Sequence, residues 1–134
     1  MLQNDLAARL HGYLKNAKQE GVLLSSIART ATATSSDVSV VSGTGLVVVL
    51  DVTVGALLDL ITTIQRKDIA SGKYVTILTS AAVTGVSTNT YKVYPGIAAV
   101  ANLTVNDVLT GTFRVVVTHG NATSCTYTVG YSIV

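Results

Sequence analysis

Hydrophobic and polar residues follow a helical pattern over residues 4–20. Asn4 suits the N-cap and Gly21 suits the left-handed position that ends a helix. The apolar positions recur every three or four residues and predict an amphipathic helix with one apolar face. This stripe consists of Leu2, Leu6, Leu10, Tyr13, Leu14 and Ala17.

Beyond residue 21 the pattern changes to short segments rich in valine and threonine, which favour strands. The predicted strands cover residues 22–33, 38–41, 45–53, 58–67, 73–81, 90–95, 113–118 and 124–133. Turn residues at 68–72 and at 119–123 predict two hairpins. A short helical turn is expected at 106–109, within the longest connection. Seven or eight short strands predict an antiparallel β-sandwich of jelly-roll or immunoglobulin-like type. We therefore expect a helical arm at 1–21 and a β-domain at 22–134.

Composition narrows the classes of protein. The chain is 49% hydrophobic but only 12% charged, about half the usual charged fraction of roughly 25%. Its longest apolar run, Leu46–Leu50, has strand length, and charged residues interrupt the region where a signal peptide would be apolar. We expect no membrane partner.

Residues 1–29 carry four basic and two acidic residues, whereas residues 30–134 carry five of each. A net charge of +2 gives no reason to expect nucleic-acid binding.

Catalytic residue types are few and scattered. We expect His119 to be an exposed turn residue and Cys125 to be a small buried hydrophobe. Asp51 and Asp59 are expected to mark strand ends, and Asp68 to cap its own turn. No spacing typical of a metal site or a nucleophilic triad occurs in the sequence. The expectation is a protein without enzymatic activity, metal or cofactor.

Four residues are candidates for surface contacts. Arg66, Lys67 and Lys73 flank the first predicted turn, and Tyr94 points away from the predicted core. A carbohydrate-binding module is one alternative function, since β-sandwiches often bind sugars on exposed aromatic rings. Tyr94 is the main residue that would serve such a site.

Several segments resemble a family of small structural proteins of tailed bacteriophages. In order along residues 28–134, the similar segments are Ala28–Thr34, Gly45–Thr53, Ile64–Asp68 with Ser71–Tyr74, Lys92–Gly96 and Arg114–Gly120. The resemblance implies a capsid decoration (cement) protein, made in the host cytoplasm and incorporated into the virion. A tail, neck or fibre component is the alternative within the same class.

The pattern of the chain agrees with an assembly role. Low charge density reduces the repulsion between crowded copies, and a leucine stripe suits docking into a groove. The expected partners are copies of the chain itself, as a homotrimer, and the major capsid protein or another virion protein. The helix docks either on its own β-domain or on a neighbour, with Leu6, Leu10, Tyr13 and Leu14 at the centre of the contact.

Overall fold

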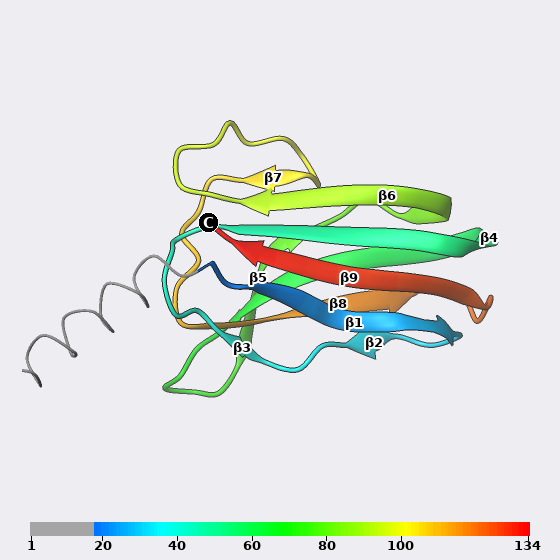
Figure 1. Ribbon diagram of the computed structural model, residues 1–134, viewed down its shortest axis with the longest axis horizontal. Coiled ribbons are helices and arrows are strands. Elements are labelled where there is room, and N and C mark those ends of the chain that lie inside the picture. Colours follow the sequence, from blue (N-terminus) through cyan, green and yellow to red (C-terminus); the bar gives the residue numbers. More distant parts are fainter. Residues whose placement is uncertain (1–17) are drawn as a thin grey trace, which may run out of the picture.

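The computed structural model describes residues 18–134, which form a mainly β fold (Figure 1). The predicted helix with its stripe (Leu2, Leu6, Leu10, Tyr13, Leu14 and Ala17) lies outside the described residues, apart from its last positions. The strands are β1 (Glu20–Arg29), β2 (Ala33–Thr34), β3 (Val38–Ser39), β4 (Leu46–Lys67), β5 (Tyr74–Thr79), β6 (Val83–Val93), β7 (Thr104–Val105), β8 (Thr112–His119) and β9 (Cys125–Ile133). Because β1 already includes Glu20 and Gly21, the predicted end of the helix at Gly21 is wrong.

The long strand β4 organises the fold. The sequence pattern predicts two strands, 45–53 and 58–67, where the structure has one strand of 22 residues. The first half of β4 pairs with β6 and β9, and the second half pairs with β5 and β8. β6 also follows β4 past the bend, where Leu60 pairs with Val83. The strand bends between the halves, where Gly55 has a φ of 141° and Leu57 a φ of 55°. Asp51 and Asp59 consequently lie within a strand and not at the predicted strand ends.

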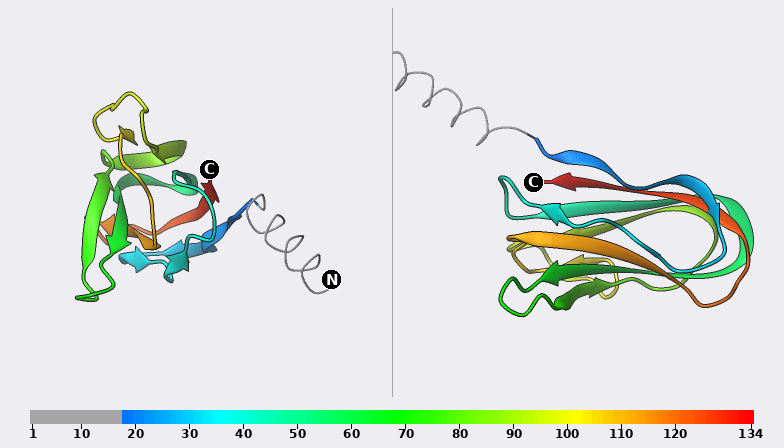
Figure 2. Two further views of the ribbon diagram at one scale, coloured as in Figure 1. Left: turned by 90° about the vertical axis from the view of Figure 1, so that its left-hand side faces the viewer. Right: turned by 90° about the horizontal axis from the view of Figure 1, so that it is seen from below.

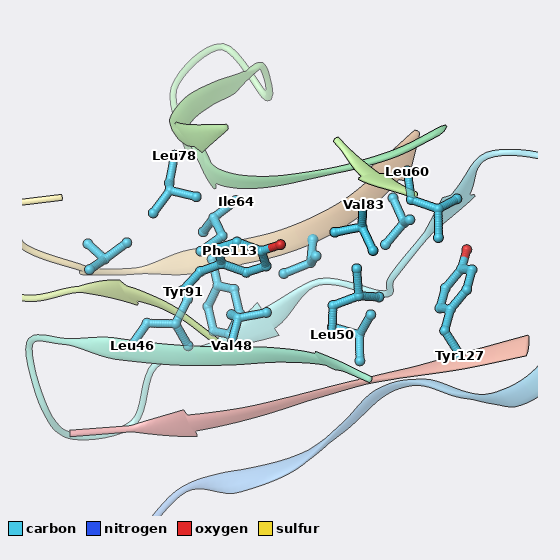
Figure 3. Close-up of a cluster of buried hydrophobic side chains, with 14 of the residues drawn as sticks. Leu46, Val48, Leu50, Leu60, Ile64, Leu78, Val83, Tyr91, Phe113 and Tyr127 are labelled. Atoms are coloured by element: carbon cyan, nitrogen blue, oxygen red, sulfur yellow. The ribbon is translucent and has the colours of Figure 1, made fainter. Parts of the chain in front are cut away.

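The bend in β4 brings two parts of one hydrogen-bonded sheet face to face around the core (Figure 2). One part has the order β1-β9-β4-β6-β7, and the other contains β5, β8, β2 and β3 around the second half of β4. Alternate residues of each strand point into the space between them. The largest fully buried side chains, several of which are shown in Figure 3, are Tyr127, Phe113, Leu46, Leu50, Leu60, Ile64 and Leu109.

The first predicted hairpin is confirmed. β4 and β5 pair up to Lys67 and Tyr74. Asp68 closes the turn as expected: its carboxylate Oδ2 accepts hydrogen bonds from the Ser71 hydroxyl at 2.6 Å and from the Ser71 amide at 3.2 Å. The Gly72 amide also donates to the Asp68 carbonyl at 2.7 Å.

The second predicted hairpin is wrong. β8 pairs with β4, β2 and β3, while β9 pairs with β1 and β4, and the two strands do not pair with each other. Residues 120–124 therefore cross from one part of the sheet to the other. Turn residues favour a reversal of the chain, but they do not determine whether the flanking strands pair with each other.

The long connection after β6 has no helical turn at 106–109. It contains β7, which pairs with the end of β6 in parallel, and it buries Leu109 completely. The Leu109 amide donates to the Thr44 carbonyl at 2.7 Å, so tertiary hydrogen bonding replaces the local bonds of a helix.

Candidate interaction surfaces

The charged residues of the described chain gather at one end of the fold. This charged end contains the chain entry at Lys18, the β4–β5 turn and the C-terminus at Val134 (Figure 1). Between residues 18 and 134, the charged residues outside it are Arg29, Asp51 and Asp59. The opposite end is formed by the β4 bend and the loops after β5 and β8. It carries Arg29 beside Cys125 and Asp59 beside Gly120, and because its other described residues are neutral it is called the uncharged end below.

At the charged end, Asp37 and Tyr74 form the centre of a polar cluster. The Tyr74 hydroxyl donates to Asp37 Oδ1 at 2.7 Å, and Lys67 Nζ lies 3.3 Å from Asp37 Oδ2. The Arg114 guanidinium stacks on the Tyr74 ring at 3.4 Å from its centroid. The Tyr74 hydrogen bond, with Lys67, lowers the pKa of Asp37. Lys67 is thus paired within the chain, which leaves it less free to bind a partner than the sequence suggested.

The remaining predicted contact residues are divided between two places. Arg66 donates to the Val108 carbonyl at 3.0 Å and lines a hollow with Lys67, Ile69 and Val75. Lys73 is exposed in the neighbouring turn. Tyr94 does not line this hollow: its ring lies against Gly45, where a Cβ would clash with ring atom Cδ2. The structure therefore brings Arg66 and Lys67 together and leaves Tyr94 apart.

The uncharged end displays apolar side chains around the β4 bend. Leu57 is 86% exposed, Val54 59% and Val86 64%. Leu57 has a left-handed φ of 55°, a conformation that is strained for a branched apolar residue. The amide of Asn121 donates to the Leu57 carbonyl at 3.1 Å and holds this bend. Strained residues cluster at functional sites, so this end of the fold is a candidate interaction surface.

Sequence reasoning missed this surface. The signal in the sequence was the break in alternation at Gly55-Ala56-Leu57-Leu58, where two adjacent leucines cannot both face the core of a regular strand. The structure buries Leu58 and exposes Leu57.

His119 lies at the end of β8 and not in an exposed turn, which corrects the sequence-based expectation. Its Nε2 atom is 2.8 Å from the hydroxyl of the buried Tyr127. Burial, with the nearby Arg29, lowers the pKa of His119. Arg29 also stacks over the Tyr127 ring at 4.7 Å and donates to the Tyr127 carbonyl at 3.0 Å.

Cys125 is buried beside this cluster, as expected for a small hydrophobe. Burial raises the pKa of the Cys125 thiol, which disfavours the thiolate that nucleophilic chemistry requires. Its sulfur faces the Arg29 carbonyl at 3.7 Å.

Residues 18–134 contain neither a metal-binding cluster nor a membrane-spanning helix. Within this part of the chain, no three histidine, cysteine or acidic side chains are arranged so that they could hold a metal ion. None of its segments forms a helix long and apolar enough to cross a bilayer.

Comparisons with known proteins give structural matches only. No protein-family model and no curated protein matches the chain. A structure of infectious bursal disease virus, Gx strain, matches 87% of this chain with 11% identity and a TM-score of 0.47. A structure of the Gt strain matches 89% with 12% identity and a TM-score of 0.41. The chain spans only 31% and 32% of those viral chains.

Proposed function

We propose that the chain is a non-enzymatic structural protein of a bacteriophage particle, and specifically a capsid decoration protein that joins neighbouring subunits of the head. We infer a β-sandwich, built on the two facing parts of the sheet, as its architecture. The expected assembly is a homotrimer bound to the major capsid protein. The segments that resemble small tailed-phage proteins support the phage assignment, and a tail, neck or fibre position is the alternative within it.

One observation carries the proposal: the exposed, strained Leu57 on an end of the fold whose charged side chains are Arg29 and the half-buried Asp59. Arg29, one of the few charges outside the charged end, is bound to the Tyr127 carbonyl and stacked on its ring. A partner that covers Leu57, Val54 and Val86 gains apolar burial worth roughly 1.5–3 kcal/mol for each fully covered side chain. Such a partner desolvates few charges in the process. These are the properties of a contact between packed subunits.

The test is the mass of the purified full chain in solution, compared with that of Leu57→Asn. Asparagine tolerates a left-handed φ, so this variant keeps the bend and removes the apolar contact. Ile69→Asn is the matched control, since Ile69 is 73% exposed but lies in the turn of the charged end. We expect a wild-type oligomer that Leu57→Asn weakens and Ile69→Asn leaves intact.

Other results would overturn the proposal. A monomeric wild-type chain, or an oligomer that Leu57→Asn leaves unchanged, contradicts a contact through the uncharged end. A monomer whose binding to a glycan array disappears in Tyr94→Ala would favour the carbohydrate-binding alternative. Electron microscopy that places the chain on the tail would replace the decoration role with the tail alternative.

A further inference from the structure

The outer face of the sheet contains an apolar hollow close to the charged end. In one cross-strand row, Gly130 of β9 lies between Val22 of β1 and Val49 of β4. Since Gly130 has no side chain, the two valines flank an empty position. Val47 and Ser132 extend the hollow in the next row, and its volume is about 390 Å³. Val22 is 69% exposed, so the described residues leave this hollow uncovered.

The start of the described chain is fixed beside the hollow. The Gln19 carbonyl accepts from the Ile133 amide at 2.8 Å, which extends the β1–β9 ladder by one residue. The Gln19 side chain donates to the Ser39 carbonyl at 2.8 Å and accepts from the Val41 amide at 3.0 Å. The chain is therefore already extended where it enters β1 at Gln19.

The sequence of residues 1–17 has the chemistry to fill such a hollow. Its leucines recur at helical spacing, and an amphipathic helix binds a groove through anchors at this spacing. The segment also carries Arg9 and Lys15 against a single acidic residue, Asp5. Glu20 lines the hollow and offers a carboxylate to the basic residues of the segment, while Lys92 lies beyond Val47 in the same cross-strand row.

A second copy is the better source of the segment than the same chain. Gln19 is held in the β1–β9 ladder, so the same chain could reach its own hollow only through a reversal before this residue. The leucine pattern runs to Leu14 and Ala17, which leaves few residues for a reversal of the chain. We propose that residues 1–17 of one copy dock, through their leucine stripe, into the Val22–Gly130–Val49 hollow of a second copy. This inference rests on the proposed assembly function and adds a second contact between the copies, separate from the uncharged end.

Filling the hollow tests the proposal. Gly130→Val adds a side chain where a Cβ has only ordinary contact, 3.6 Å from the Gly21 carbonyl oxygen. Thr76→Val is the control, because Thr76 is exposed in β5 opposite Gln65 and lines neither this hollow nor the uncharged end. We expect the dissociation constant of self-association to rise about tenfold or more in Gly130→Val, as for the loss of one leucine contact, and to stay unchanged in Thr76→Val. Leu10→Asp in the segment should act like Gly130→Val.

Cysteine cross-linking shows whether the docked segment comes from the same chain or from a second copy. In one sample, Leu10→Cys chains and Val49→Cys chains are mixed and oxidised. In a second sample, a single chain that carries both substitutions is oxidised, and the buried Cys125 does not compete in either. A disulfide-linked pair of one chain of each kind is the expected product. Two results overturn the proposal: a disulfide only within the chain that carries both cysteines, or no disulfide in either sample. If Gly130→Val has no effect while Leu57→Asn still weakens the oligomer, the docking proposal fails and the assembly function stands.

Discussion

The hydroxyl of Tyr127 and Nε2 of His119 lie 2.8 Å apart and connect two strands that do not pair with each other. Tyr127 belongs to β9 in one part of the sheet, and His119 ends β8 in the other. The bond therefore ties the two parts together at the uncharged end. Within the described chain, Nδ1 of His119 is buried and has no hydrogen-bond partner, so a protonated ring would have no acceptor for the hydrogen on that nitrogen.

Stability should fall as the pH drops from neutral towards 5. Burial and Arg29 lower the pKa of His119 in the folded chain, so the unfolded chain binds the proton first. Below the ordinary histidine value of about 6.5, protonation then favours unfolding until the folded pKa is reached. Urea unfolding between pH 7.5 and 5 should show this loss, and His119→Gln should reduce the slope. An equal slope in both proteins would contradict the role of His119.

Tyr127→Phe should lower the free energy of unfolding by about 1–2 kcal/mol. The change removes the hydroxyl and leaves the partly buried His119 ring without its partner. Burial also raises the pKa of Tyr127 to about 12, so its hydroxyl is protonated at neutral pH. Tyr74→Phe is a suitable comparison, because the Tyr74 hydroxyl binds the exposed Asp37 and its loss should cost less. Chemical denaturation of both variants at pH 7 measures the difference.

Leu57→Asn should raise the free energy of unfolding of the monomer by about 0.5–1 kcal/mol while it weakens association. Leucine is strained at a φ of 55°, whereas asparagine tolerates this region. Asn102, at a φ of 65°, offers the reverse test, and Asn102→Ala should be destabilising. Thermal unfolding at low protein concentration separates the two effects. A lower melting temperature for Leu57→Asn would contradict a strained bend.

Gly72→Ala should destabilise the β4–β5 hairpin by about 1 kcal/mol. Gly72 has a φ of 72°, and a methyl group added there would meet nothing within 4 Å, so the cost is conformational and not steric. Gly85→Ala, in open space without a positive φ, should be neutral or stabilising. Equal denaturation midpoints for the two variants would contradict this explanation.

The sequence predicted the buried face of each strand better than it predicted the partner of each strand. Alternation placed Tyr91 and Val93 of β6 on one face, and the structure buries both. The same alternation in β8 and β9 gave no information about pairing, and the hairpin expected between them does not form. Alternation reports which side of a strand meets the core, because side chains point to opposite faces with a period of two.

At the candidate surfaces, too, the sequence predicted local features but not contacts between distant residues. The sequence placed Arg66, Lys67 and Lys73 beside one turn because a turn with basic flanks is a local feature, and Asp68 caps that turn through local hydrogen bonds. Their role in surface contacts stays a prediction. The pairing of Lys67 with Asp37, thirty residues away in sequence, was not identifiable. The segment with Leu2, Leu6, Leu10, Tyr13, Leu14 and Ala17 remains a sequence prediction.

By itself, the sequence determined a mainly β chain, its hydrophobic alternation, its low charge and the capped turn at Asp68, because each depends on neighbouring residues. The tertiary structure decided that β4 is one bent strand shared by two parts of the sheet, and that β8 and β9 lie in different parts. It also decided that Leu57 is exposed under strain and that Gly130 leaves a hollow between two valines. These features depend on contacts between residues far apart in the chain. A local sequence pattern does not encode how such residues pack, nor the entropy lost when the loops between them close.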